Sequence, residues 1–281
     1  MRFSANLGFL WAELPLPDAI RAAKTAGFDA VECHWPFATP AADVRAVLNE
    51  TGLRMLGLNT ARGDVSAGEN GLAALPERSD DARAAIDDAI AYARAIGCGS
   101  VHVMAGFASG PAASETLVAN LGYACTQAAP HGITILIEPL NRYDAPEYFL
   151  TTTTQAIDLI DTVQAPNLKL IFDCYHVQLM EGDLGHKLNG LLPYIGHIQF
   201  ASVPDRGPPT TGEVNYPHIF EVIGSLGYDK PLGAEYKPKG RSASSTLKAR
   251  PRSSIMRRSL STAKTTMHPV ASFQYKSYLL T

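Results

Sequence analysis

Residues 78–104 read RSDDARAAIDDAIAYARAIGCGSVHVM and contain the repeating unit of the fold in one stretch. Between Arg78 and Ile96, small and branched apolar residues recur at helical spacing, in a stripe made of Ala82, Ala85, Ile86, Ala89, Ile90 and Ala93. Gly97 follows, in the position where a glycine commonly ends a helix. The next apolar run, Ser100–Met104, is short and contains two valines, which is typical of a buried strand. The stretch therefore predicts a helix, a glycine cap and a buried parallel strand in succession.

The same succession recurs as far as Glu235. Eight short apolar runs are expected as strands: Phe3–Phe9, Ala30–His34, Leu53–Asn59, Ser100–Met104, Thr134–Glu138, Leu168–Asp173, Ile195–Phe200 and Leu232–Glu235. Helical spacing is found between them at Asp18–Ala26, Arg78–Ile96, Thr152–Val163 and Tyr216–Leu226. Eight such units predict an α/β fold, a single-domain (β/α)₈ TIM barrel. A doubly wound open sheet uses the same units, but it usually has fewer strands, and its Gly-rich phosphate turn is missing after the first strand.

The composition is that of a globular protein. A chain of 281 residues with 46% hydrophobic and 18% charged residues can bury a sizeable core. No apolar run reaches the ~18 residues of a membrane helix, and Met1–Pro15 has no cleavable signal pattern, so no membrane partner is expected. The four cysteines are widely spaced without a C-x-x-C pair, which predicts reduced thiols in a cytoplasmic protein.

Charge is distributed unevenly along the chain. Up to Glu235 there are 14 Lys and Arg residues against all 27 Asp and Glu residues, and the remaining 10 basic residues follow without an acidic one. The acidic body argues against a broad nucleic-acid surface, so no nucleic-acid partner is expected.

We expect a catalytic barrel domain over residues 1–240. Residues 241–281, basic and rich in Ser, Thr and Arg, are expected to be a partly disordered tail that replaces or alters the last helix; a basic arm for nucleic acid or an anionic membrane is the less favoured interpretation.

Oxygen-bearing side chains close the last four predicted strands. Glu138, Asp173, Gln199 and Glu235 each come at or near the carboxyl end of a strand, where TIM barrels hold their catalytic groups. Three carboxylates cannot share a dry pocket as bare anions, because desolvation and mutual repulsion would protonate them. A divalent cation resolves this conflict, and four oxygen donors without cysteine suit Mg²⁺ or Mn²⁺ better than zinc. We therefore predict one such metal site, although each residue alone could be an ordinary polar strand end.

Two histidines and one arginine are further candidates. His176, three residues after Asp173, is expected to reach the same pocket. His102 lies within the fourth predicted strand and either faces the barrel interior or is a hydrogen-bonded core histidine. His197 is expected to pack one layer below Gln199. Arg206, in the loop after the seventh strand, is either a clamp for a substrate carboxylate or a surface arginine.

Several segments of the chain together resemble one enzyme family. They are Ser4-Ala-Asn-Leu7, Ala26-Gly-Phe-Asp-Ala-Val-Glu32, Val101-His-Val-Met-Ala-Gly106, Glu138-Pro139, Asp173-x-x-His176, Val203-Pro-Asp-Arg-Gly207, Gly212-Glu-Val-Asn-Tyr216 and Glu235-Tyr-Lys-Pro-Lys-Gly240. From about Met1 to Gly240 the chain resembles the hydroxypyruvate isomerases of the xylose isomerase-like, endonuclease IV-like barrel superfamily.

The resemblance implies a function and a set of site residues. It implies a TIM barrel with one divalent cation that interconverts hydroxypyruvate and 2-hydroxy-3-oxopropanoate (tartronate semialdehyde), or a close 2-oxo acid, through an enediolate. By this resemblance Glu138, Asp173, Gln199 and Glu235 are metal ligands, and Glu138 and Glu235 are the acid/base pair. It also makes His176 and Arg206 substrate contacts, to which we add His102 and Lys237 as candidates.

The resemblance ends after Gly240, and other functions stay open. The family's Gly-Leu-x-Trp segment, which opens the last helix, is absent here, which puts the eighth helix and any oligomer contact it makes in doubt. A ketose 3-epimerase would use the same metal and glutamates, but it usually has a histidine in place of Gln199 and acts on uncharged sugars. An abasic-site nuclease of the endonuclease IV type would need several zinc ions and a basic DNA face. A non-catalytic barrel with an altered C-terminus is the remaining alternative, and a homo-oligomer is possible in each case.

Overall fold

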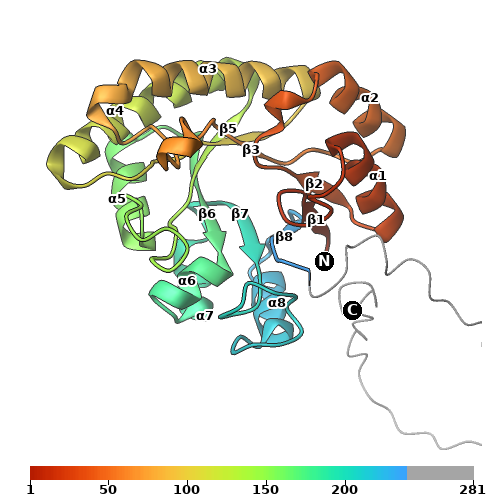
Figure 1. Ribbon diagram of the computed structural model, residues 1–281. Coiled ribbons are helices and arrows are strands. Elements are labelled where there is room, and N and C mark those ends of the chain that lie inside the picture. The colour runs from red at the N-terminus through yellow and green to blue at the C-terminus, as the bar shows by residue number, and fades with distance from the viewer. Residues whose placement is uncertain (239–281) are drawn as a thin grey trace, which may run out of the picture.

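The computed structural model describes residues 1–238 as a ring of strands surrounded by helices (Figure 1). The predicted tail, residues 241–281, lies outside the described residues. Eight strands are formed: Phe3–Asn6 (β1), Ala30–Glu32 (β2), Leu58–Asn59 (β3), Ser100–His102 (β4), Thr134–Ile137 (β5), Leu168–Asp173 (β6), Ile195–Phe200 (β7) and Leu232–Ala234 (β8). The helices are Leu16–Ala26 (α1), Ala41–Thr51 (α2), Ser79–Ile96 (α3), Gly110–Ala128 (α4), Thr153–Val163 (α5), Cys174–Met180 (α6), Leu184–Leu191 (α7) and Tyr216–Ser225 (α8). Short 3₁₀ helices lie at Pro36–Ala38 (η1), Val65–Ala67 (η2), Pro76–Arg78 (η3) and Ala129–His131 (η4).

All strand pairs are parallel, and the sheet order is β2-β1-β8-β7-β6-β5-β4-β3. The two ends of this order meet, because Val31 of β2 bridges Met55 in parallel and Leu56 N–H donates to the Val31 carbonyl at 2.8 Å. The sheet is therefore a closed barrel, and the predicted TIM-barrel fold is confirmed.

The third strand is shorter than its sequence suggests. A strand was expected over Leu53–Asn59, but the regular strand is Leu58–Asn59. The segment before it still lies against β2, since Val31 N–H donates to Arg54 O at 3.0 Å and Cys33 N–H to Gly57 O at 3.1 Å. These bonds to β2 close the barrel. Pairing with β4 is limited to Leu58 and Asn59, so only these two residues form a regular strand.

The helices use the expected apolar stripe and glycine caps. In α3, the predicted stripe from Ala82 to Ala93 is buried against the barrel. The helix ends at Gly97, whose φ of 75° lies in the left-handed region that residues with a Cβ rarely adopt. The helices thus cover the outer face of the barrel, and its inner face is left to the polar side chains described below.

None of the helices in residues 1–238 combines the length and the apolarity that crossing a bilayer requires. The four cysteines, Cys33, Cys98, Cys125 and Cys174, are free and buried.

Candidate active site

The four predicted oxygen donors all lie at or near the carboxyl ends of their strands, on one end of the barrel. Asp173 ends β6, Gln199 lies in β7, and Glu138 and Glu235 directly follow β5 and β8. All four are buried, with 7% or less of their surface exposed. A cavity of about 400 Å³ runs through the barrel interior, from the amino ends of the strands, where Ser100 and Thr134 line it, to Glu138, Gln199 and Glu235. The Arg206 side chain connects Asp173 to this group, since its Nη2 lies 3.7 Å from Asp173 Oδ2 and 2.9 Å from Glu235 Oε2.

The pKa values of the three carboxyl groups, Glu138, Asp173 and Glu235, are shifted in different directions. Burial would raise the pKa of Glu235, but the Arg206 charge and the hydrogen bond with His34 lower it to about 2. Burial and the neighbouring Glu235 charge raise the pKa of Asp173 to about 8. Burial, Glu235 and Asp173 raise the pKa of Glu138 well above its ordinary range. The Arg206 guanidinium thus keeps Glu235 ionised. Asp173 and Glu138 have too little positive charge near them to stabilise their ionised forms, so their pKa values are raised.

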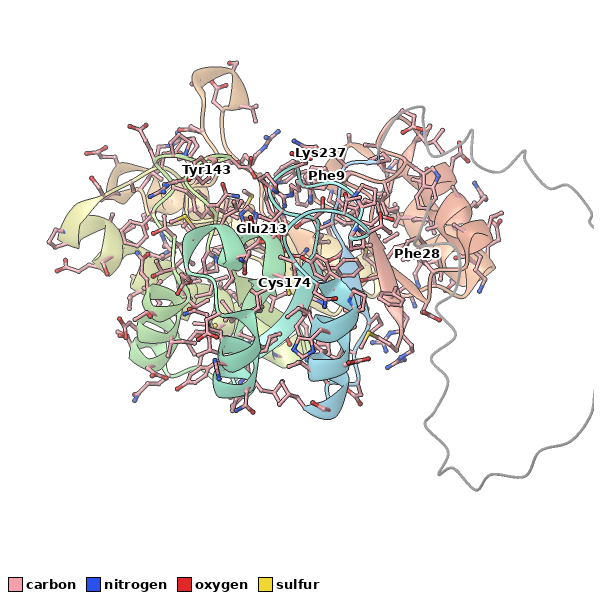
Figure 2. All side chains as sticks on the ribbon, turned by 90° about the horizontal axis from the view of Figure 1, so that it is seen from below. Phe9, Phe28, Tyr143, Cys174, Glu213 and Lys237 are labelled. Carbon is pink, nitrogen blue, oxygen red and sulfur yellow. The ribbon has the colours of Figure 1, made fainter. Side chains whose placement is uncertain are left out.

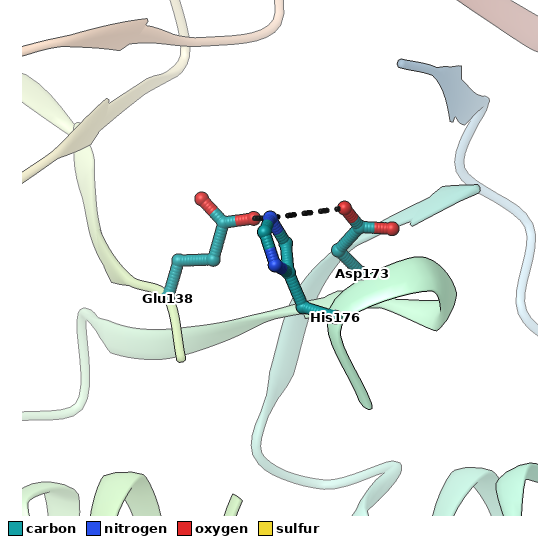
Figure 3. A group of neighbouring side chains, drawn as sticks. All are labelled: Glu138, Asp173 and His176. Atoms are coloured by element: carbon teal, nitrogen blue, oxygen red, sulfur yellow. Dashed lines mark ion pairs between the residues drawn. The ribbon is translucent and has the colours of Figure 1, made fainter. Parts of the chain in front are cut away.

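His176 contacts the two carboxylates through its ring (Figure 3). Ligand atoms of Glu138, Asp173 and His176 lie within 4.8 Å of one another, and His176 Nε2 is 3.6 Å from Asp173 Oδ2. The backbone N–H of Asn141 donates to His176 Nδ1 at 3.0 Å. Because a backbone N–H can only donate, Nδ1 is the acceptor and a neutral ring has its proton on Nε2. Burial and the Arg206 charge lower the pKa of His176 to about 3, so its neutral ring presents an N–H donor to the pocket.

Three oxygen atoms of the cluster are buried without a hydrogen-bond partner among the described residues. They are Glu138 Oε1, Asp173 Oδ2 and Gln199 Oε1. Unpaired buried oxygens are costly, and they are the donors that a hard divalent cation prefers. The oxygen donors present therefore fit a cation such as Mg²⁺ or Mn²⁺.

Arg206 is held in a fixed position at the rim of the pocket. Its guanidinium carbon lies 4.7 Å from the ring centroid of Phe9 and 4.9 Å from that of Tyr175. Asp144 accepts a hydrogen bond from Arg206 Nη1 at 3.3 Å and another from Tyr175 OH at 3.0 Å. Arg206 is therefore not a surface arginine but a largely buried cation beside the carboxylates.

The other predicted contacts lie at different depths. His102 is buried, with Nδ1 3.7 Å from Glu138 Oε2, and burial lowers its pKa to about 4. Lys237 is exposed, at the same end of the molecule as Phe9 (Figure 2). Its backbone N–H donates to the Arg206 carbonyl at 2.7 Å, so the structure gives its main chain, and not its ammonium group, a contact at the site.

Sequence reasoning missed several residues of this cluster. His34 is not among the predicted site residues, yet its Nε2 lies 3.0 Å from Glu235 Oε1, and Asn6 Nδ2 donates to the same oxygen at 3.0 Å. Asn6 ends β1, and His34 lies two residues after β2. The rule applied to the last four strands would have found His34, which closes a predicted strand, but not Asn6, which lies inside the predicted run Phe3–Phe9. Asn141 and Asp144 lie in the loop after Glu138, where no spacing or motif pointed to them.

The closed (β/α)₈ barrel has buried acids and an arginine at its carboxyl end. These features place the chain among the TIM-barrel proteins that hold polar site residues at this end. Within that class, residues 20–261 match the model of the xylose isomerase-like TIM barrel family. The chain belongs to this family.

Relatives with assigned names match most of the chain. It is 46% identical over 242 residues to "2-oxo-tetronate isomerase" of Cupriavidus necator, covering 85% of this chain and 93% of that protein. It is 40% identical over 243 residues to "Hydroxypyruvate isomerase" of Escherichia coli K12, covering 85% and 94%. A solved structure described as an AP endonuclease, family 2, from Brucella melitensis is 39% identical, with a TM-score of 0.84 over 88% of this chain and 96% of that one.

Proposed function

We propose that this protein is an isomerase of small 2-oxo acids. The relatives' names support this class, and the substrates proposed are hydroxypyruvate and 2-hydroxy-3-oxopropanoate or a close homologue such as a 2-oxo-tetronate. The observation that carries the proposal is the buried pair Glu138 and Glu235 on one cavity, with Arg206 2.9 Å from Glu235. Two carboxyls can move a proton between adjacent carbons, and a guanidinium beside them can bind a carboxylate.

We assign Glu138, Asp173, Gln199 and Glu235 as the residues that would hold one divalent cation, Mg²⁺ or Mn²⁺. When bound, such a cation would stabilise the negative charge that develops on the substrate oxygens as the α-proton leaves. His176 has a different role in this proposal, because a ring whose Nδ1 accepts from Asn141 has no free lone pair on Nε2. It would donate its Nε2–H to a substrate oxygen.

The proton transfer falls to the two glutamates. One carboxylate removes the proton α to the carbonyl, which gives an enediolate, and the other group returns a proton to the neighbouring carbon. In the pocket without a cation, the pKa of Glu138 is raised and that of Glu235 is lowered, so the two carboxyls differ in protonation before a cation binds. His102, 3.7 Å from Glu138, would hold the Glu138 carboxyl in place.

Arg206→Ala is expected to raise KM for hydroxypyruvate about 10- to 100-fold, the effect of losing a hydrogen bond between charged groups. An uncharged hydroxyketone has no carboxylate for the guanidinium, so its KM should change much less. The matched control is Arg142→Ala. Arg142 is exposed, and its side chain contacts the neighbouring Tyr143 and no residue of the proposed site among the described residues. Equal effects on charged and uncharged substrates would contradict the clamp.

The metal-free protein is expected to lose thermal stability as pH rises from about 7 to 8, above the range in which the buried His102 and His176, with pKa values lowered to about 4 and 3, would take up protons on unfolding. The pKa of Asp173 is about 8 in the folded protein against an ordinary 3.8, so between these values the folded state binds a proton that the unfolded chain has released. Stability therefore falls with rising pH in this window. The lowered pKa of Glu235, about 2 against 4.5, acts below this window and stabilises the protein throughout it. The raised pKa of Glu138 acts in the same direction. Unfolding midpoints in EDTA measure the slope, and Asp173→Asn should reduce it to the part that Glu138 contributes; an unchanged slope would exclude Asp173 as a source.

The substrate assay separates the alternatives. Turnover of hydroxypyruvate, followed by coupled reduction of the aldehyde product, tests the proposal directly. A ketose 3-epimerase would instead act on a free ketohexose, and an abasic-site nuclease would contain more than one zinc per chain and cut abasic DNA. Inactivity toward all of these would favour a non-catalytic barrel. A cytoplasmic location and a homo-oligomer stay predictions.

A further inference from the structure

Glu32, at the end of β2, is a buried acid that the proposed reaction does not use. Only 5% of its surface is exposed, and its carboxylate accepts three hydrogen bonds inside the barrel. Oε2 accepts from His197 Nε2 at 2.8 Å and from Gln199 Nε2 at 3.1 Å, and Oε1 accepts from Ser4 Oγ at 3.2 Å. The donors come from β1 and β7, so Glu32 joins three strands in the layer next to the rim.

The contact with Gln199 decides which way its amide points. A primary amide has an N–H₂ donor on one side and an oxygen acceptor on the other. Because Nε2 donates to Glu32, Oε1 is on the opposite side, where it is buried without a partner. The flipped amide would place its oxygen against a carboxylate oxygen, which is repulsive, and would present N–H groups where an acceptor is needed.

The barrel leaves space for this arrangement at one position. A Cβ on Gly233 of β8 would lie 2.3 Å from Glu32 Oε1, 2.7 Å from Gln199 Cγ and 2.8 Å from His197 Nε2. No side chain can occupy that position while the three neighbours stay in place. Gly233 thus allows a polar network where TIM barrels ordinarily pack branched apolar side chains.

We propose that Glu32 is a positioning residue for the cation site: it fixes the Gln199 amide so that Oε1, and not the N–H₂ group, is the ligand. This inference rests on the proposed function, because it takes Gln199 as a cation ligand. Groups that orient metal ligands commonly change metal affinity 10- to 100-fold when they are altered.

Two substitutions at Glu32 separate orientation from charge. Glu32→Asp keeps the charge but withdraws the carboxylate by one methylene, so it should lose the bond to Gln199 and weaken Mn²⁺ binding about 10- to 100-fold. Glu32→Gln removes the charge but can accept from Gln199 and His197 with its oxygen and donate to Ser4 with its amide. It should bind Mn²⁺ within about threefold of the wild type. If Glu32 acts by its charge, the order of the two variants is reversed.

The measurement is Mn²⁺ affinity of the full chain, from the electron paramagnetic resonance signal of the free ion, with unfolding midpoints to verify the fold. Ser4→Ala is the matched control, because it removes a bond to the other Glu32 oxygen and should leave the affinity unchanged. In a Gln199→Ala background, Glu32→Asp should cause no further loss.

Wild-type affinity in Glu32→Asp, or an equal further loss in the Gln199→Ala background, would overturn the inference while leaving the proposed cation site standing. A wild-type protein that binds no Mn²⁺ would contradict the cation site itself, and this inference with it.

Discussion

Glu138→Gln is expected to lower kcat about 10²- to 10⁴-fold while leaving the fold intact, the usual size of an acid/base contribution. The amide has nearly the shape of the carboxyl, so the packing around His102 and the cavity is kept. It cannot accept or release the proton that the isomerisation moves, and it is a weaker cation ligand than a carboxylate. Initial rates with hydroxypyruvate, together with a circular dichroism spectrum, measure the two parts of this expectation.

Glu235→Gln is expected to lose turnover by a similar factor but also to lower the unfolding temperature. Glu235 accepts hydrogen bonds from Arg206 and Asn6, and it lies 3.0 Å from His34 Nε2. The substitution removes the negative charge that balances the buried Arg206 guanidinium. Glu213→Gln is the control, because Glu213 is exposed near the same end of the barrel (Figure 2). If either glutamate variant turns over at a near-normal rate, that residue is not the base.

The fold was readable from the sequence because parallel strands are buried on both faces. Their apolar runs are continuous, and a glycine ends each of the first three helices, at Gly27, Gly52 and Gly97. The third strand was less well predicted, since an apolar run such as Leu53–Asn59 does not reveal which of its residues have partners on both sides. Closure through Val31 and Met55 is a property of the assembled ring.

The sequence predicted those site residues that lie at the carboxyl ends of strands. The last polar residue of each late strand gave Asp173 and Gln199, because the carboxyl ends of parallel strands meet at one rim. The contact between His34 and Glu235 joins positions 201 residues apart in sequence and was missed. The proton position on His176 depends on one backbone N–H in a loop, and the place of Arg206 depends on Phe9 and Tyr175. Such contacts require three-dimensional coordinates, since no local pattern encodes them.

Removal of divalent cations is expected to abolish turnover. Without a cation, the raised pKa values of Glu138 and Asp173 leave these groups protonated near neutral pH, so neither is available as a carboxylate. The enediolate charge would then be met only by His176, Arg206 and other fixed donors of the pocket. Dialysis against EDTA followed by assay in chelator-treated buffer measures the loss, and Mn²⁺ or Mg²⁺ in excess of the remaining chelator should restore the rate.

The same experiment distinguishes a catalytic cation from a structural one. The packing between strands and helices is apolar, and the strands are joined by hydrogen bonds, so the circular dichroism spectrum should be unchanged when activity is lost. Asp173→Asn gives the matched case, because it removes one proposed ligand charge and should weaken restoration by Mn²⁺ without unfolding the chain. Full activity in excess chelator would exclude the cation from the reaction. Glu138 and Asp173 would then be protonated, Glu235 would be the carboxylate that removes the proton, and Arg206 would have to stabilise the enediolate in place of the ion.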